Sequence, residues 1–277
     1  MQVQVNGTRL WFDVEGPALV PRGDAMVERP TLVLVHGGPG SFDHSYFKPW
    51  FARLAEQMQV VYLDLRGHGR STWRDAATWT FEACADDVRA ICDALGLARP
   101  VVLGHSMGGF IAILYGAQHP GHAAGLILSS TFARFDLDRL AAGFRRVGGN
   151  EIGELARRGY SVDDLTEEDD DRVFAAFGPT IPSPEAMARR VQNLDVAPRG
   201  GELLVHLDLL DQLPRITSPT LVSVGELDPL AFEPAEEVMA GLSPGVGQLD
   251  VLHGAGHFPW LDEPDRFFAS IADFVSR

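Results

Sequence analysis

Lysine is almost absent from this chain, and no long apolar segment is present. Lys48 is the only lysine among 277 residues, so arginine carries nearly all of the positive charge, and the formal net charge is −15. A chain with such an excess of carboxylates repels nucleic acid and anionic membrane surfaces. No apolar run approaches the roughly 20 residues of a membrane-spanning helix. We therefore expect neither nucleic acid nor a membrane as a partner.

Cysteine is scarce as well, and the two cysteines cannot pair with each other. Cys84 and Cys92 both fall in a segment, residues 81–95, whose pattern predicts a helix. Their separation along a helix is about 12 Å, whereas the Cα atoms of a disulfide lie within about 7 Å of each other. The N-terminus has no basic region followed by an apolar stretch, so we expect no signal peptide. Both observations favour a reducing, cytoplasmic location.

Short apolar runs alternate with segments of helical length over most of the chain. Residues 31–35, for example, form an apolar run that is typical of a strand buried on both faces. The alternation predicts an α/β fold with a doubly wound, mostly parallel sheet and helices on both faces. The expected strands are residues 31–35, 60–63, 101–103, 125–129, 219–224 and 248–252, and the expected helices are residues 44–57, 81–95, 110–118, 234–241 and 264–275.

The N-terminal segment has a different pattern from this α/β repeat. Residues 2–5 and 9–14 alternate between apolar and polar and are joined at Asn6-Gly7, which predicts an antiparallel hairpin. Residues 16–30 could be a loop or an edge insertion.

The alternation is interrupted between residues 131 and 213, which are highly charged and helical in pattern. Because it resumes at residue 219, we expect one core domain, residues 1–131 and 214–277, with an inserted helical cap, residues 132–213. Residues 163–171 of this cap are strongly acidic and could attract a substrate amine. The spacing that starts at Thr166 is, however, that of a capping box, which favours a helix that begins there.

The most informative motif is Gly104–Gly108, which reads G-H-S-M-G. It follows the apolar run of residues 100–103 and precedes a helix-like segment. A strand, a tight turn flanked by glycines and a helix together raise a serine hydroxyl from the edge of a sheet, where it can act as a nucleophile. The motif therefore predicts that Ser106 is catalytic.

A serine nucleophile needs a base that takes its proton and an acid that orients the base. In sheets of this type the acid and the histidine follow the serine in that order, at the carboxyl ends of strands. The strand 219–224 runs into a loop with Glu226 and Asp228, and the strand 248–252 leads to His257. We expect Asp228 as the acid and His257 as the base.

His253 lies four positions before His257, a spacing that would suit a metal site on a helix. Glycines between the two histidines disfavour a helix, and no H-E-x-x-H motif occurs. We therefore place His253 at the surface or behind the site, and we expect no metal ion.

Two backbone amides should stabilise the oxyanion that forms when a nucleophile attacks a carbonyl. One is expected from Met107, the residue after the nucleophile. The second is expected from the loop of residues 36–40, which follows the strand 31–35 and reads H-G-G-P-G. Glycines let the backbone approach a reacting carbonyl closely, and Gly38 is the candidate.

Four blocks of the sequence together resemble the α/β-hydrolase fold: the H-G-G-P-G loop, residues 64–71, the Ser106 motif and residues 254–257. The first two blocks also resemble the proline iminopeptidase family, whose members remove an N-terminal proline from peptides. The resemblance implies a structural role for Asp64 and Arg66, which would brace the loops beneath the site. It implies the same nucleophile, acid, base and oxyanion donors as above: Ser106, Asp228, His257, Gly38 and Met107.

Two features depart from the iminopeptidase pattern. Iminopeptidases usually carry G-G-S-W-G at the nucleophile, whereas G-H-S-M-G is common among esterases, lactonases and hydrolases of carbon–carbon bonds. Iminopeptidase caps also hold the substrate amine with acids, one of them in a Glu-Asn-His-Tyr-like stretch that residues 132–213 lack. Glu185, Glu202 and Asp208 are the acids that could replace it.

The motifs together predict a serine hydrolase that acts through an acyl-enzyme and needs no cofactor. The expected substrate is a small ester, a lactone, or a short amide or peptide. The alternatives are a carboxylesterase or lactonase without peptidase activity, and a receptor that keeps the hydrolase fold but does not turn its ligand over. The sequence does not predict the oligomeric state.

Overall fold

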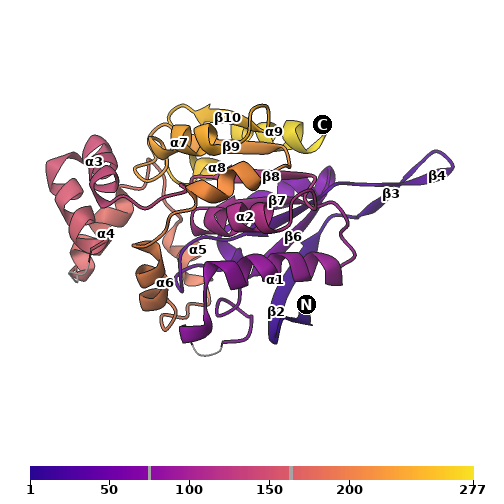
Figure 1. The fold of residues 1–277 in the computed structure, drawn as a ribbon, viewed down its shortest axis with the longest axis horizontal. Coiled ribbons are helices and arrows are strands. Elements are labelled where there is room, and N and C mark those ends of the chain that lie inside the picture. Colours follow the sequence, from indigo (N-terminus) through magenta and orange to yellow (C-terminus); the bar gives the residue numbers. More distant parts are fainter. Residues whose placement is uncertain (74–75, 162–164) are drawn as a thin grey trace.

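An eight-stranded sheet with helices on both faces forms the body of the molecule (Figure 1). The computed structural model describes residues 1–73, 76–161 and 165–277. The strands lie in the order β1-β2-β6-β5-β7-β8-β9-β10. The pairs β1–β2 and β2–β6 are antiparallel, and all other neighbours are parallel. The predicted α/β class with a mostly parallel sheet is thereby confirmed. The strands are β1 Gln2–Val5, β2 Thr8–Glu15, β5 Thr31–Val35, β6 Gln59–Asp64, β7 Val101–His105, β8 Gly125–Ser129, β9 Thr220–Gly225 and β10 Gly247–Leu252.

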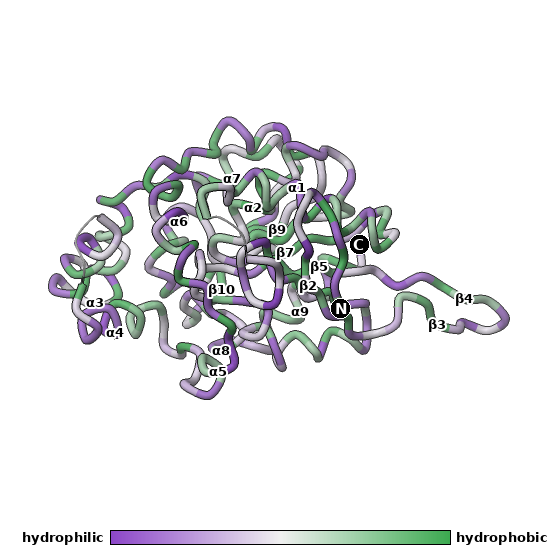
Figure 2. Tube along the Cα trace, turned by 90° about the horizontal axis from the view of Figure 1, so that it is seen from below, coloured by the Kyte–Doolittle hydropathy of each residue, from purple (hydrophilic) through white to green (hydrophobic). Residues whose placement is uncertain are grey.

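The two faces of the sheet bury separate apolar cores. In β5, Val33 and Val35 pack into one core and Leu32 and Leu34 into the other, because side chains alternate across a strand. Figure 2 shows apolar residues along the central strands β5, β7 and β9. The first core is covered by α1 Phe81–Ala94, α2 Met107–Gln118 and α7 Pro234–Gly241, and the second by α8 Pro259–Asp262 and α9 Pro264–Val275.

The predicted helix over residues 44–57 is wrong. The segment forms two 3-10 helices, η1 His44–Tyr46 and η2 Trp50–Glu56. Pro49 stands between them, and because proline has no amide hydrogen it interrupts the hydrogen-bond pattern of a continuous helix. Two further 3-10 helices are η3 Ala76–Thr78 and η4 Leu210–Arg215.

Residues 16–30 fold into a separate hairpin. Its strands, β3 Leu19–Arg22 and β4 Ala25–Glu28, pair with each other and project from the body of the molecule (Figures 1 and 2).

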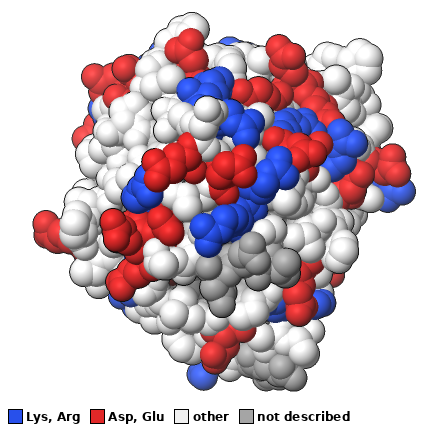
Figure 3. All heavy atoms as spheres, turned by 90° about the vertical axis from the view of Figure 1, so that its left-hand side faces the viewer, with Lys and Arg blue, Asp and Glu red and all other residues white. Residues whose placement is uncertain are grey.

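Four α-helices of the described residues between β8 and β9 form what we call the helical insertion: α3 Leu137–Gly159, α4 Glu167–Ala175, α5 Pro184–Ala188 and α6 Ala197–Leu204. The predicted start of α4 is confirmed, because Thr166 Oγ1 accepts the backbone N–H of Asp169 at 3.2 Å. Asp163 and Asp164 of the acidic stretch lie outside the described residues. Figure 3, which views the molecule from this side, shows acidic and basic side chains interspersed.

The helical insertion leaves and re-enters the core at neighbouring points. The backbone N–H of Leu209 donates to Ala133 O at 2.7 Å, and that of Phe135 donates to Leu207 O at 2.9 Å. These bonds close the insertion at its base. On this ground we propose a core of residues 1–131 and 214–277 and a cap of residues 132–213.

The cysteines and the helix lengths concern the expectations about disulfides and membrane-spanning segments. Cys84 and Cys92 are buried, and neither is in a disulfide. Within the described ranges, no helix is both long and apolar enough to cross a membrane.

Candidate active site

Ser106 lies in the sharp turn between β7 and α2. Its backbone has φ 55° and ψ −122°, a conformation that few residues other than glycine adopt and that often marks functional sites. The flanking glycines are required by packing. A Cβ at Gly104 would overlap the carbonyl of Gly108, and one at Gly108 would overlap the carbonyl of Val35.

Three hydrogen bonds hold the strained backbone of Ser106 in place. Its N–H donates to Ser129 O at 2.9 Å. Its carbonyl accepts from Thr131 Oγ1 at 2.8 Å and from the N–H of Gly109 at 2.8 Å. These neighbours fix the turn through the backbone and leave the hydroxyl unused, because Ser106 Oγ makes no hydrogen bond to any described residue.

His257 and Asp228 form a buried pair. His257 Nδ1 lies 3.0 Å from Asp228 Oδ2, and both side chains are buried. The other oxygen, Asp228 Oδ1, accepts from the N–H groups of Leu230 at 2.8 Å and Ala231 at 3.2 Å. A carboxylate that accepts at Nδ1 places the ring proton there and leaves Nε2 of the neutral ring free to accept a proton.

Ser106 and His257 line the same cavity. The ring of His257 contacts those of His105 and Phe177, with centroids 4.9 Å away in each case. Its backbone N–H donates to Phe177 O at 2.7 Å, so a residue of the helical insertion fixes the loop that carries the imidazole. The sheet topology thus brings the hydroxyl and the imidazole to one cavity although they are far apart in sequence.

His105 is a weaker base than an ordinary histidine. Burial lowers its pKa well below the ordinary value for histidine, and the neighbouring His257 lowers it further. The ring is therefore uncharged at neutral pH and packs beneath His257 as an aromatic group.

The loop of residues 36–40 lies directly against Ser106. A Cβ built on Gly37 would lie 3.0 Å from Ser106 Cβ and 3.5 Å from Ser106 Oγ. The N–H of Gly37 donates to Tyr46 Oη at 2.9 Å, and that of Gly40 donates to His68 Nε2 at 2.8 Å. Gly38 has a φ of 56°, a value that favours glycine.

The two amides predicted to bind an oxyanion have no competing partner. Among the residues that the structure describes, no acceptor is found for the N–H of Gly38 or of Met107. Both residues line the cavity with Ser106. Each amide can therefore donate to a ligand oxygen.

The sequence did not single out Tyr46 or His68 as residues that position the loop, although His68 lies within the motif of residues 64–71. Burial raises the pKa of the Tyr46 phenol well above its ordinary value. Burial also lowers the pKa of His68 to about 3, with a further contribution from His36. His68 is therefore neutral, and its Nδ1 hydrogen faces Arg66 O at 2.9 Å while Nε2 accepts from Gly40.

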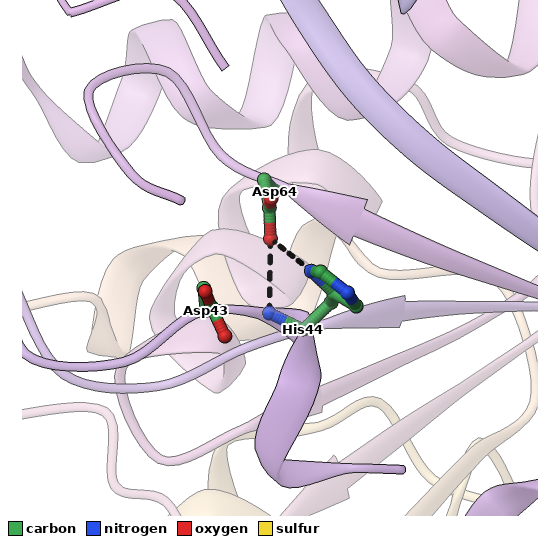
Figure 4. Close-up of side chains that lie close together, drawn as sticks. All are labelled: Asp43, His44 and Asp64. Carbon is green, nitrogen blue, oxygen red and sulfur yellow. Dashed lines mark hydrogen bonds and ion pairs between the residues drawn. The ribbon is translucent and has the colours of Figure 1, made fainter. Parts of the chain in front are cut away.

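Asp64 holds the loops beneath the site. Its Oδ1 accepts from the backbone N–H of His44 at 2.9 Å and from His44 Nδ1 at 2.7 Å, as Figure 4 shows, and its Oδ2 accepts from the N–H of Arg70 at 2.9 Å. Burial would raise the pKa of Asp64, but the hydrogen bond and charge of His44 outweigh it and hold that pKa below its ordinary value. Arg66 pairs with the buried Asp87 at 2.6 Å.

Asp43, His44 and Asp64 lie close enough to hold a metal ion (Figure 4). The chemistry of the cluster is nevertheless structural. Asp43 accepts from the N–H of Ser45 and of Val191, each at 2.8 Å, and Asp64 is occupied as described above. The Arg70 guanidinium lies 3.2 Å from His44 Nε2, where it would repel a cation.

The remaining candidates lie away from the cavity. His253 is exposed and contacts Glu226 at 3.3 Å, whereas the buried His257 contacts Asp228. Glu185, Glu202 and Asp208 are exposed, and none of them lines the cavity. Their suggested role in holding a substrate amine has no support at this site.

Comparison with known proteins agrees with the fold and with the motifs. The family model for the alpha/beta hydrolase fold matches residues 30–160. A protein named as a carbamate hydrolase from Caulobacter sp. (strain K31) is 27% identical over 270 residues, 92% of this chain and 93% of that protein. Proline iminopeptidase from Lactobacillus helveticus is 27% identical over 273 residues, 90% of this chain and 91% of that protein.

A solved structure gives the same result for the fold. Proline iminopeptidase from Mycobacterium smegmatis has a TM-score of 0.82 at 24% identity, over 100% of this chain and 97% of that chain. The chain has the α/β-hydrolase fold. Within that class it resembles the proline iminopeptidase family, as its H-G-G-P-G and residue 64–71 motifs predicted.

Proposed function

We propose that this protein is a serine hydrolase that cleaves a small ester or amide through an acyl-enzyme. One observation carries the proposal: the strained Ser106 lines the same cavity as His257, and His257 is hydrogen-bonded to the buried Asp228 behind it. A nucleophile, a base and an orienting acid in that arrangement are what acyl transfer requires.

The reaction would proceed in two halves. Ser106 Oγ attacks the carbonyl carbon, and His257 Nε2 takes its proton while Asp228 stays ionised and stabilises the imidazolium. The N–H groups of Gly38 and Met107 donate to the oxyanion. The bond to the leaving group then breaks, and His257 gives it the proton. Water, deprotonated by the same imidazole, releases the acid and restores the serine.

The substrate would be a small molecule or a short peptide, since α4, α6 and Tyr160, which directly follows α3, supply residues over the cavity. The resemblance to proline iminopeptidase supports an amide, and the G-H-S-M-G motif supports an ester or a lactone. With two unpaired buried cysteines, the cytoplasm is our proposed location. No cofactor is part of the mechanism.

Covalent labelling tests the nucleophile. A fluorophosphonate probe should label the protein, and Ser106→Ala should abolish the labelling. A receptor that only binds could also be labelled, so turnover of p-nitrophenyl butyrate over many equivalents is the second measurement. Labelling without any turnover of esters, lactones or arylamides would favour the receptor, and absence of labelling would refute the serine mechanism.

A further inference from the structure

The cavity beside Ser106 is walled mainly by aromatic rings. On the core side, the rings of Phe110 and Phe132 lie 4.8 Å apart, and that of Phe81 packs 5.5 Å from Phe110. On the opposite side, Phe174 and Phe177 of the helical insertion pack 5.7 Å apart. An acyl group bound to Ser106 would therefore be surrounded by apolar surface.

Charged side chains are missing from this wall. Among the described residues that line the cavity, there is no aspartate, glutamate, lysine or arginine. Asp228 sits behind His257, and both of its oxygens are already hydrogen-bonded. Asp170 and Asp171 line a neighbouring cavity, and the two spaces share a wall that includes the rings of Phe42, Tyr160 and Phe174.

A charged substrate amine is disfavoured in such a cavity for two reasons. An ammonium group would lose its hydration without finding a carboxylate in return. It would also lie close to His257, which must itself become positively charged when it takes the proton of Ser106. This repulsion acts on the transition state, so it lowers the rate of acylation, in addition to the weaker binding that the lost hydration causes.

We infer that the acyl group accepted by Ser106 is uncharged and apolar, of the aryl or cyclic alkyl kind, and that the protein does not act as an aminopeptidase. This inference rests on the proposed serine hydrolase activity and specifies the substrate class of the same site. It separates this chain from the relatives named proline iminopeptidase.

Matched substrates test the inference directly on the full chain. The p-nitrophenyl esters of cyclopentanecarboxylic acid and of proline have the same leaving group and the same ring size, and they differ in one ring position, CH₂ against NH₂⁺. Each kcat/KM is divided by the spontaneous hydrolysis rate of that ester at the same pH, because an ammonium group activates its own ester. We expect the corrected value to be at least tenfold higher for the cyclopentane ester.

A variant tests the physical cause. Leu204, on α6, lines the cavity. Leu204→Glu should shift the preference towards the prolyl ester by at least tenfold, and Leu204→Gln, which has the same shape without the charge, should not. Labelling of Ser106 by fluorophosphonate in both variants confirms that they are folded.

The outcomes separate the two proposals. A labelled enzyme that prefers the prolyl ester, or that cleaves proline arylamide faster than any neutral ester, overturns the inference alone. A protein that is neither labelled at Ser106 nor active on either ester overturns the proposed function and the inference with it.

Discussion

Tyr46 Oη accepts the backbone N–H of Gly37 at 2.9 Å, immediately beside Ser106. The bond takes up the amide that stands next to Gly38 and fixes the loop in the orientation where the Gly38 N–H has no partner among the described residues. A tyrosine buried beneath the loop thus decides which of two adjacent amides is available to a ligand.

Tyr46→Phe should therefore slow catalysis without weakening substrate binding. The change leaves the N–H of Gly37 without its acceptor, and a buried unsatisfied donor costs about 1–3 kcal/mol. We expect kcat to fall about tenfold, corresponding to ~1.4 kcal/mol, with KM nearly unchanged. Steady-state kinetics on a p-nitrophenyl ester measure both. Tyr62→Phe is the matched control, because the Tyr62 hydroxyl bonds to Glu15 away from the cavity. An equal loss in the two variants would rule out a positioning role for Tyr46.

Asp228→Asn should abolish most of the activity while the fold is retained. An amide at this position no longer fixes the proton on Nδ1 of His257 and cannot stabilise the imidazolium, so we expect kcat to fall by about 10⁴. Glu226→Gln is the control, since the Glu226 carboxylate lies near the exposed His253 ring and the N–H of Gly254, away from the cavity. If Glu226→Gln were the inactive variant, the assignment of the acid would be wrong.

Gly104→Ala should destabilise the protein. The added methyl would overlap the carbonyl of Gly108 and the methyl of Ala112, and overpacking of this kind costs about 1–3 kcal/mol. Gly201→Ala is the matched control, because a Cβ there, in the interior of α6, meets open space. A helical Gly→Ala change should raise stability by up to about 1 kcal/mol. Urea unfolding of both variants measures the difference, and equal midpoints would contradict the packing argument.

Stability should fall as the pH is lowered from 6.5 to 4.5. The pKa of His68 is lowered from 6.5 to about 3 in the folded protein. Between pH 6.5 and 4.5 the unfolded chain therefore binds a proton at His68 that the folded chain does not bind. The free energy of unfolding then falls by up to about 1.4 kcal/mol per pH unit for this residue. The pKa values of His36 and His105 are lowered in the same direction, chiefly by burial. Loss of the favourable Asp64 interactions begins only at lower pH, because the pKa of Asp64 is below 3.8.

Urea unfolding at pH 7.5, 6.5, 5.5 and 4.5 measures this slope. NMR of the histidine ring protons gives an independent readout, in which the His68 ring should show no titration above pH 4.5. A flat stability profile, or titration of His68 near pH 6, would show that the buried ring is charged in the folded state.

The sequence predicted the sheet well for definite physical reasons. Residues 31–35 and 125–129 are short apolar runs that only a buried parallel strand accommodates, and both are strands of the structure. The G-H-S-M-G motif depends on local sterics, because Gly104 and Gly108 leave no space for a side chain. Local constraints of this kind can be read from the residues themselves.

Other parts of the structure depend on contacts between distant segments and could not be predicted. Tyr46 is recognisable only once η1 is seen to lie against the loop of residues 36–40. The composition of the cavity wall is likewise a tertiary property, because Phe110 comes from α2 and Phe174 from the helical insertion.

The broken helix at residues 44–57 was predictable in principle from Pro49.

The hydrogen bond from the His257 backbone to Phe177 O has a consequence for how such proteins diversify. Gly178 and Gly256 meet at the same contact, where a Cβ on either would approach the backbone of the other. The segment that follows α4 is therefore fixed to the loop after β10, which carries the His257 imidazole. A chimera that carries the helical insertion of a relative would change its substrate selectivity and displace His257 at the same time, unless the contact between Gly178 and Gly256 were kept.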